Sequence, residues 1–401
     1  MTTDKHNKRP NVPPLRFPEF TDEWETRKLS EFTERVTRKN KGQTNLPLTI
    51  SAQYGLVDQI SFFNNKVASA DMSNYYLLKK GEFTYNKSYS TDYPLGAIKR
   101  LDRYEMGALS TLYICFKING DIESDFLVHY FESPKWHRGV YEIAGEGARN
   151  HGLLNIAVGD FFETQHFRPK SIREQEKIAH FLTLIQHRIE VQSGLINKLE
   201  SLISGITLSI MKSDHCESIR LSELLTERIE VNTAQHDVYS VSVSQGVVNQ
   251  VEYLGRSFAA KDTSNYNVVH YGDIVYTKSP TGDFPYGIVK RSNQAKPVAV
   301  SPLYGVYIPA SNDIGCFLHY YFCNAVSTKN YLHKLIQKGA KNTINITNQR
   351  FLENTIKLPN TERLAIVVKL LNQLSVKKQR AEELLALYRK QKQHLLSQMF
   401  I

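Results

Sequence analysis

The sequence predicts an α+β protein in which two long helices separate two homologous domains. Two observations carry this prediction: a domain-sized segment recurs about 191 residues further along the chain, and a long heptad-patterned segment follows each copy. With 401 residues the chain exceeds what one hydrophobic core usually serves, so at least two domains are expected. We expect the two helices to pair as an antiparallel coiled coil, which would relate the halves by an approximate two-fold axis.

The repeat is clearest in residues 73–100 and 264–291, where 12 of 28 aligned positions are identical. Shorter matches keep nearly the same offset, as in GLVDQ at 55–59 and GVVNQ at 246–250. Offsets between 189 and 193 along both halves indicate a duplicated domain rather than a solenoid repeat. Residues 109–118 and 298–308 are rich in aromatic and β-branched side chains, so we expect them to form strands.

The segment after each copy has apolar residues in alternating steps of four and three, the 3.5-residue period of a helix with a helical partner. Gln192 is the polar residue in the first seam and would fix the register of the pair. Pro169 and Pro359 precede the two segments, as is typical of helix starts. The predicted seam consists of Ile178, Leu182, Ile185, Ile189, Gln192, Ile196, Leu199 and Ile203 in the first helix and Leu371, Leu374, Leu385 and Leu395 in the second.

These patterns divide the chain into an N-terminal extension (1–20), a first domain (21–170), a first helix (171–213), a second domain (214–359) and a second helix (360–401). The net charge of +10 is uneven along these parts. The second helix holds half of the excess, whereas the first domain carries equal numbers of basic and acidic residues. Net charge by itself therefore does not indicate a nucleic-acid partner.

Several classes of protein are not favoured by the sequence. No run of about 18 apolar residues occurs, and the first twenty residues lack the apolar stretch of a secretory signal. The four cysteines show no CxxC spacing, so we expect a cytoplasmic protein without a disulfide framework. No nucleotide-binding, metalloprotease or amino-methyltransferase motif is present, and no metal-ligand spacing, which predicts a chain with neither catalytic residues nor a metal site.

Basic and polar residues near the repeated Pro-x-Gly turn and in the repeated Gly-Ala-Arg/Lys-Asn loop are candidates for contact with DNA. Lys, Ser and Arg suit phosphates, Arg or Lys suits guanine, and Asn suits adenine. The structural alternative is that the first group caps a hairpin in solvent and that the loop is a helix C-cap glycine with a polar turn. The candidates are Lys87, Ser88, Lys99, Arg100, Arg149 and Asn150 in the first half and Lys278, Ser279, Lys290, Arg291, Lys341 and Asn342 in the second.

Three groups of residues together resemble the specificity (S) subunit of type I restriction–modification systems. They are PLRFPEF at 14–20 with Trp24 and Lys28-Leu29, the Gly-x-x-x-Tyr-x-Lys-Ser segments at 81–88 and 272–279, and EQEKIA at 174–179 with Phe181-Leu182 after Pro169. The second junction departs from this pattern, because TERLAI at 361–366 lacks the Glu-Gln pair. The resemblance covers nearly the whole chain.

The resemblance implies that each globule is a target recognition domain for one half of a split DNA sequence and that the helices set the spacing. It also implies that the helices dock two methyltransferase (modification) subunits, which use S-adenosylmethionine, and that the complex recruits restriction (translocase/nuclease) subunits driven by ATP with Mg. No cofactor is expected on this chain.

Two regions diverge between the halves: 36–50 from 229–241, and 59–72 from 250–263. If each domain reads DNA, this divergence predicts two different half-sites and an asymmetric target. The competing interpretation is a non-enzymatic scaffold, whose coiled coil joins two protein-binding globules without contact to DNA. The near-neutral charge of the globules favours that alternative.

Overall fold

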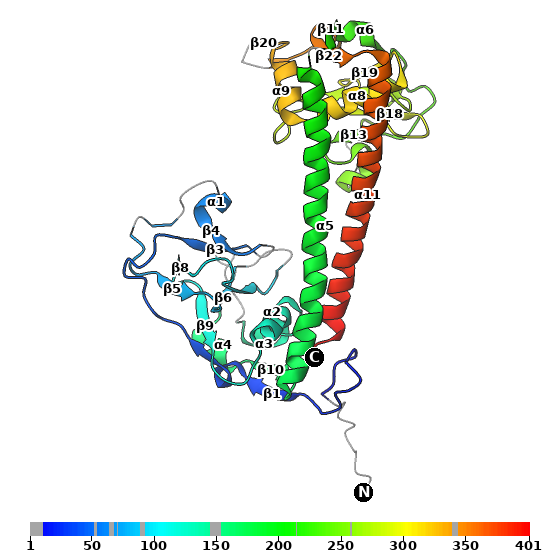
Figure 1. The fold of residues 1–401 in the computed structure, drawn as a ribbon. Helices are drawn as coiled ribbons and strands as arrows, with labels where there is room; N and C mark the ends of the chain where they lie inside the picture. The colour runs from blue at the N-terminus through cyan, green and yellow to red at the C-terminus, as the bar shows by residue number, and fades with distance from the viewer. Residues whose placement is uncertain are drawn as a thin grey trace. The chain divides into compact units, whose positions relative to one another are not determined.

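The computed structural model describes residues 11–51, 54–63, 68–69, 71–88, 93–144, 154–213, 215–256, 259–338 and 344–401. The chain forms two compact units: unit 1 comprises Met1–Val191 with Leu384–Ile401, and unit 2 comprises Gln192–Glu383. Helices α5 (Ile172–Lys212) and α11 (Thr361–Gln398) are each divided between the units, with one segment of each helix in unit 1 and the other in unit 2 (Figure 1). In the described part of the chain, no helix has the length and apolar character needed to cross a membrane.

Unit 1 is built on a four-stranded antiparallel sheet with the order β2-β9-β6-β7, flanked by three two-stranded sheets. The small sheets pair β1 with β10, β3 with β4, and β5 with β8. The strands are β1 (Glu25–Lys28), β2 (Thr33–Arg35), β3 (Leu48–Ser51), β4 (Gly55–Asp58), β5 (Tyr76–Lys79), β6 (Phe83–Asn86), β7 (Ala97–Arg100), β8 (Met106–Leu109), β9 (Ile114–Ile118) and β10 (Gln165–Arg168). The helices besides α5 are η1 (Leu29–Glu31), α1 (Gln59–Phe63), α2 (Ser124–Glu132), α3 (His137–Ile143) and α4 (Val158–Glu163).

Unit 2 repeats this topology element by element. Its four-stranded sheet has the order β12-β19-β16-β17, and its small sheets pair β11 with β22, β13 with β14, and β15 with β18, with one further pair, β20 and β21. The strands are β11 (Cys216–Arg220), β12 (Leu225–Glu227), β13 (Tyr239–Ser242), β14 (Gly246–Asn249), β15 (Asn267–Val269), β16 (Ile274–Thr277), β17 (Ile288–Arg291), β18 (Val298–Val300), β19 (Gly305–Pro309), β20 (Gln337–Lys338), β21 (Ile344–Asn345) and β22 (Thr355–Pro359). The helices besides α11 are α6 (Leu221–Leu224), α7 (Gln250–Leu254), α8 (Asn312–Cys323), α9 (Ala325–His333) and α10 (Asn348–Phe351).

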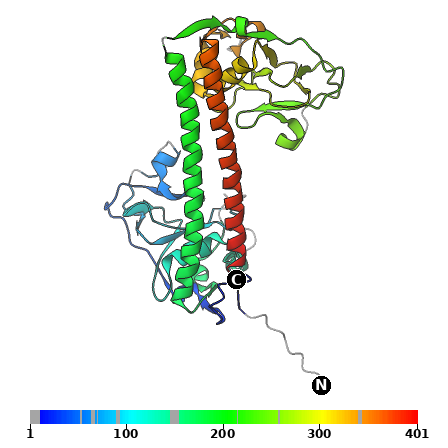
Figure 2. The same ribbon diagram turned by 45° about the vertical axis from the view of Figure 1, so that its right-hand side comes forward.

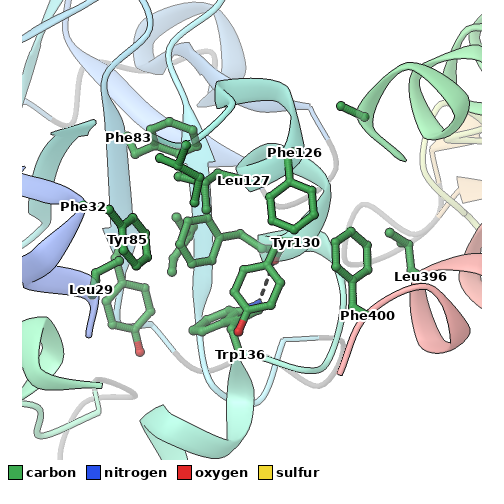
Figure 3. Packing of buried hydrophobic residues seen from close by; sticks show 14 of the residues in the cluster. Leu29, Phe32, Phe83, Tyr85, Phe126, Leu127, Tyr130, Trp136, Leu396 and Phe400 are labelled. Atoms are coloured by element: carbon green, nitrogen blue, oxygen red, sulfur yellow. Dashed lines mark hydrogen bonds between the residues drawn. The ribbon is translucent and has the colours of Figure 1, made fainter. Parts of the chain in front are cut away.

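The four-stranded sheet of each unit separates two hydrophobic cores. In unit 1 the side chains of Phe83, Tyr85 and Phe116 point to a large core that also contains residues of α2, α5 and α11 (Figure 3). Cys115 faces the other way, into a smaller core under β3, β4, β5 and β8. Unit 2 has the same two clusters. This alternation follows from the two-residue period of a strand, which sends successive side chains to opposite faces.

The two long helices pair in antiparallel fashion, as the sequence predicts. In unit 1 the start of α5 packs with the end of α11, and in unit 2 the end of α5 packs with the start of α11. Figures 1 and 2 both show the helices side by side. Every predicted seam residue is buried or half-buried. The predicted fold class, two homologous α+β domains joined by two paired long helices, is confirmed.

The strand prediction for 109–118 and 298–308 is too simple. Each segment holds the end of one strand, a turn and the next strand, so β8 is followed by β9, and β18 by β19. The turns close through Tyr113 N donating to Ser110 O (3.2 Å) and Tyr304 N donating to Ser301 O (3.0 Å). Serine in these turns interrupts a β-branched pattern that would otherwise continue as one strand.

The Pro-x-Gly turns between β6 and β7 and between β16 and β17 need glycine for two reasons. Gly96 and Gly287 have φ angles of +77° and +107°, which side chains rarely allow. A Cβ on Gly96 would lie 2.2 Å from Asn86 O, and one on Gly287 would lie 2.1 Å from Thr277 O. These backbone clashes explain why the turn glycine is present in both copies.

We expect Gly287→Ala to destabilise unit 2 by about 2 kcal/mol or more, because the substitution meets both a positive φ and a backbone oxygen. The matched control is Gly194→Ala in α5, where a Cβ meets nothing within 4 Å and the backbone is helical. That change should stabilise the protein by up to about 1 kcal/mol. Thermal and urea unfolding would measure both, and equal effects would contradict the assignment of the turn.

Candidate nucleic-acid interface

The N-terminal segment binds the start of α5 through a buried carboxylate. Arg16 donates from Nε to Glu174 Oε1 (2.7 Å) and from Nη2 to Oε2 (2.8 Å), and Trp24 Nε1 donates to Oε1 (3.1 Å). Glu174 is 2% exposed, so its charge is tolerable only because these three donors replace water. Glu174 is 158 residues from Arg16 and 150 residues from Trp24, so this contact joins the N-terminal segment to the first turn of α5.

A second set of contacts runs beside this ion pair. The ring of Phe17 meets that of Phe181 edge to face with centroids 5.9 Å apart, and Lys177 Nζ lies 4.7 Å above the Phe17 ring centre. Lys177 also pairs with Glu19. The segments PLRFPEF and EQEKIA, which carry the family resemblance, therefore bind each other in the folded chain.

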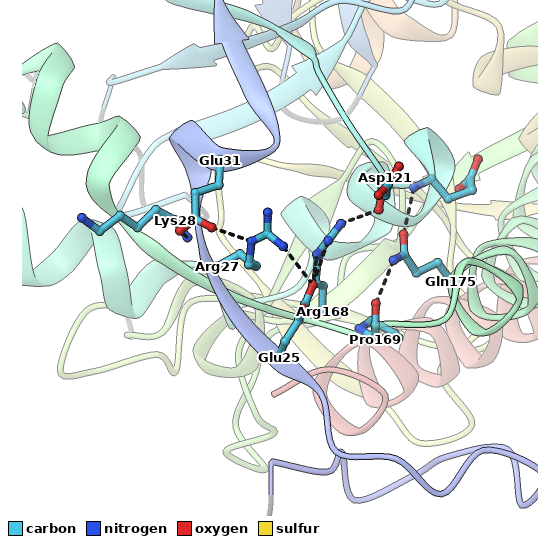
Figure 4. A network of polar contacts seen from close by, with 9 residues as sticks. Glu25, Arg27, Lys28, Glu31, Asp121, Arg168, Pro169 and Gln175 are labelled. Carbon is cyan, nitrogen blue, oxygen red and sulfur yellow. Dashed lines mark hydrogen bonds and ion pairs between the residues drawn. The ribbon is translucent and has the colours of Figure 1, made fainter.

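The junction between β10 and α5 is tied down by a polar network (Figure 4). Arg168, in β10, pairs with Glu25 in the facing strand at 2.7 Å and donates to Asp121 O. Gln175 donates to Pro169 O (2.8 Å) and accepts from Glu123 N (2.8 Å). Because these side chains hold the backbone on both sides of the helix start, α5 leaves the domain in a fixed direction.

The last residues of α11 and the chain end complete the core of unit 1. Leu15 N donates to Gln398 O (3.0 Å), and Phe400 is fully buried. The Phe400 ring lies 5.4 Å from Phe126 and 5.7 Å from Tyr130, centre to centre (Figure 3). The first domain is thus closed by the end of the chain.

The junction between β22 and α11 lacks the Glu-Gln pair, and apolar packing holds the start of this helix instead. Ser171 accepts from Glu174 N at the start of α5, and Asn360 accepts from Arg363 N at the start of α11. Aligning these two caps places Leu364 at the position of Gln175. Leu364 is buried in the larger core of unit 2, so hydrophobic contact there replaces the Gln175 hydrogen bonds.

The polar residues in the seam have specific partners. Gln192 Nε2 donates to Ala381 O (2.9 Å), so this side chain links the two helices as the sequence predicts. Lys378 pairs with Glu200 across the helices of unit 2 at 2.8 Å. In unit 1, Lys392 pairs with Glu132 of α2 and donates to Gln186 of α5. A partner at each of these positions penalises a shifted register, since a shift would leave buried donors unpaired.

The structure places the predicted DNA-contact residues in two groups and leaves a third undescribed. Lys99 pairs with Glu132 (3.3 Å), and Arg100 pairs with Asp102 and Asp125, both at 2.7 Å. Lys290 donates to Cys323 Sγ, and Arg291 donates to Asn293 and Asn312. These four cations join β7 to α2 and β17 to α8 inside their domains, which differs from the alternative of a hairpin cap in solvent. As DNA contacts they stay predictions.

The other turn residues lie closer to the surface. Lys87 Nζ donates to Ile156 O (3.4 Å) and is half-buried, and burial lowers the pKa of Lys278. Ser88 and Ser279 are exposed. Whether any of the four touches DNA stays a prediction. The remaining candidates, Arg149, Asn150, Lys341 and Asn342, lie outside the described residues.

One duplicated position has different chemistry in the two halves. The offset of 191 residues that relates Lys99 to Lys290 also relates Glu132 to Cys323. Burial raises the pKa of Glu132, but Lys99 and Lys392 outweigh it and the pKa falls to about 2. The atoms packed around the sulfur likewise oppose the Cys323 thiolate although the residue is exposed, and His319 and Lys290 lower its pKa to about 6. A cysteine in unit 2 thus takes the place of a glutamate in unit 1.

Sequence reasoning passed over Glu132, Cys323, Arg16 and Glu174 as partners. The repeat offset could have matched Glu132 with Cys323, because each lies 33 residues after the matching lysine, Lys99 or Lys290. No local pattern could have paired Arg16 with Glu174 across 158 residues.

We expect Cys323 to react with iodoacetamide as a thiolate, with half-maximal labelling near pH 6. The reaction should rise with pH because the thiolate is the nucleophile, and Cys323 is exposed. Cys115 is an internal control, since burial raises its pKa to about 12 and should keep it unlabelled at pH 6 to 9. Peptide mass spectrometry would measure both.

Lys290→Met removes one of the two cations and should move the half-maximal pH of Cys323 labelling upward by at least about one unit. A wild-type midpoint near the ordinary thiol value of 9 would show that the two cations do not stabilise the thiolate.

Comparisons with known proteins bear on the fold. No protein-family model and no curated protein sequence matches the chain. A crystal structure of the S subunit of a type I restriction–modification system from M. genitalium superposes with a TM-score of 0.57 at 13% identity, covering 97% of this chain and 99% of that one.

A second solved chain comes from a structure on complex assembly and conformational transition of the type I R-M system. It superposes with a TM-score of 0.52 at 13% identity, covering 96% of this chain and 99% of that one. Both superpositions include the two domains and the two helices, so they match the architecture rather than a shared domain type. The family resemblance in the sequence is therefore confirmed at the level of structure: this chain has the fold of a type I restriction–modification specificity subunit.

Proposed function

We propose that this protein is the DNA-binding specificity subunit of a type I restriction–modification enzyme. Each domain would read one half of an asymmetric, bipartite target, and the paired helices would set the unspecified gap between the halves. The observation that carries the proposal is the duplication itself: two domains of identical strand order stand on one helix pair, in a fold shared with S subunits. Two reading domains on a spacer suit duplex DNA, whose half-sites recur along the helix.

We assign methylation and cleavage to partner subunits rather than to this chain. A similar chain belongs to a structure of type I R-M complex assembly, which supports a role within a larger complex. S-adenosylmethionine would then bind to methyltransferase subunits, and ATP with Mg to restriction subunits. This chain would recognise the DNA sequence and set the spacing between its two halves.

The helix pair offers a surface for those subunits. With the seam as heptad positions a and d, Leu184 and Val191 of α5 and Leu384 and Leu387 of α11 occupy c and g positions in unit 1, and all four are exposed. In unit 2 the same positions expose Leu202, Ile366 and Leu370. In an antiparallel pair the g positions of both helices line the same edge, and the c positions lie next to them on each helix. Within each unit these exposed apolar residues therefore share one face. An apolar face beside a coiled-coil seam is suited to further helices, which would complete a four-helix bundle.

We expect Val191→Asp and Leu387→Asp to weaken binding of the methyltransferase subunit by about tenfold to a hundredfold, because each buries a charge in the proposed interface. Both residues are exposed in this chain, so its melting temperature should stay unchanged. The control is His187→Asp, which places the same charge on the outer side of α5. Co-purification and calorimetry measure the loss, and equal effects of the three variants would contradict this docking face.

The test of DNA reading is co-expression of this chain with a methyltransferase subunit, followed by single-molecule sequencing of host DNA for methyladenine. The expected result is a split, asymmetric motif that disappears when this chain is deleted. A palindromic motif would contradict the claim that the two domains read different half-sites.

The structure adds an observation in favour of the scaffold alternative, because Lys99, Arg100, Lys290 and Arg291 bind internal partners. Duplex binding separates the two functions. A DNA reader binds more weakly as salt rises, because phosphate contacts release counterions, whereas a protein scaffold shows no specific duplex binding at any salt concentration.

A further inference from the structure

Each unit carries the same small projection on the sheet face opposite the helices. Unit 1 has the hairpin β3–β4 followed by α1, and unit 2 has the hairpin β13–β14 followed by α7. The register is identical, since Ser51 faces Gly55 and Ser242 faces Gly246. We call residues 48–51 with 54–63 tip 1, and residues 239–254 tip 2. We propose that the two tips, together with the loop after β7 and its counterpart after β17, are the base-reading elements of the two domains; this rests on the proposed function above.

The inner side of the tips is the same in both units. Leu56 of tip 1 and Val247 of tip 2 occupy matching positions in β4 and β14, and both are buried in the smaller core of their unit. The matching segments GLVDQ at 55–59 and GVVNQ at 246–250 supply this apolar anchor, and they explain why the two projections have the same fold although their outer residues differ.

The outer side of the tips differs at matching positions. Tyr54, Ser61, Phe62 and Phe63 of tip 1 are exposed, and Tyr54 and Phe63 each have about half of their surface in solvent, at 53% and 51%. The matching residues of tip 2 are Gln245, Glu252, Tyr253 and Leu254, which are also exposed. Large exposed aromatic groups are costly without a partner. Homologous domains that keep the anchor and change the outer residues differ in what they contact there.

The neighbouring loops extend this contrast. Tyr104 Oη, in the loop after β7, accepts from Asp58 N of tip 1 (3.3 Å), and Gln294, in the loop after β17, donates to Val247 O of tip 2 (2.7 Å). The residue at the position of Gln294 in unit 1 is Arg103, which is exposed. Arginine pairs best with guanine and glutamine with adenine, so the two loops carry different base preferences.

The surface of tip 2 is hollowed and polar. A hollow of about 470 Å³ is lined by Gln245, Glu252, Tyr253 and Gln294 among others. Carboxamides, a carboxylate and a phenol supply donors and acceptors that complement those on base edges. The carboxylate, for example, can accept from the cytosine amine. Tip 1 instead offers Tyr54 and two phenylalanines, which suit thymine methyl groups. These side chains can pair with base edges, so we take DNA as the occupant of the tips, and a protein occupant is an outcome of the experiment below.

The sharpest experiment converts tip 1 into tip 2 on its outer face only. The variant carries Tyr54→Gln, Ser61→Glu, Phe62→Tyr, Phe63→Leu and Arg103→Gln, which are all exposed, and keeps every core residue. It is co-expressed with the methyltransferase subunit, and methyladenine is mapped by sequencing. We expect one half of the motif to change toward the sequence of the other half, while the second half and the gap stay as in wild type.

The matched control is Leu112→Ala with Leu303→Ala. These leucines are exposed at the turn between β8 and β9 and at its counterpart, and they are identical in the two halves, so they cannot distinguish two half-sites. Their double variant should leave the motif unchanged. The conversion of tip 1 could stop methylation altogether, and the single variant Gln245→Ala in tip 2 then tests the proposal. We expect its preference for the correct base pair at one position of the other half-site to fall about tenfold.

The failures are distinguishable. A wild-type complex that yields no split motif overturns the proposed function itself. An unchanged motif in a complex that still methylates, with unchanged discrimination in Gln245→Ala, overturns the assignment of the tips and leaves the proposed function standing. Loss of binding to a protein partner with an unchanged motif would also overturn it, because the tips would then dock protein.

Discussion

The apolar seam of α5 and α11 is the constraint on which the rest of the structure depends. Neither helix can leave that seam in water, and α11 is the last element of the chain, so pairing carries the chain end back to the domain formed by its beginning. Phe400 is buried there between Trp24, Phe126 and Tyr130, and Leu15 bonds to the last turn of α11. A register shift of the helix pair would therefore also remove apolar residues from the core of the first domain.

The duplication preserves positions and changes the chemistry at them. The ion pair between Lys99 and Glu132 is replaced by a contact between Lys290 Nζ and Cys323 Sγ, and the hydrogen-bonded Gln175 is replaced by the buried Leu364. The first replacement still joins a strand to the following helix, as β7 to α2 and β17 to α8. The second still holds the start of a long helix against its domain. The physical requirement is that a buried cation has an anion and that a helix start is held, and more than one residue type satisfies it.

The sequence was sufficient for those features that repeat or have a period. The offset near 191 predicted two homologous domains, and the 3.5-residue period predicted both long helices, because a pattern of that length reflects burial along a whole element. It could not show that Lys99, Arg100, Lys290 and Arg291 bind inside their domains. A basic pair has the same sequence on a free surface and beside a carboxylate, and Asp125 or Asn312 becomes a neighbour only once α2 or α8 packs on its strand.

The two faces of each four-stranded sheet separate two kinds of constraint. The larger core, on one face of the sheet, also contains residues of the long helices, so a substitution in that core, as at Leu371 of α11 or Phe126 of α2, would disturb helix pairing as well as the domain. The face with the smaller core carries the tip, whose exposed outer residues belong to neither hydrophobic core. Substitutions on that outer surface should therefore cost less in folding than substitutions in the larger core. The divergence between the halves is concentrated where this argument places the freedom to vary: residues 59–72 and 250–263 contain α1 and α7, and 36–50 and 229–241 reach into β3 and β13.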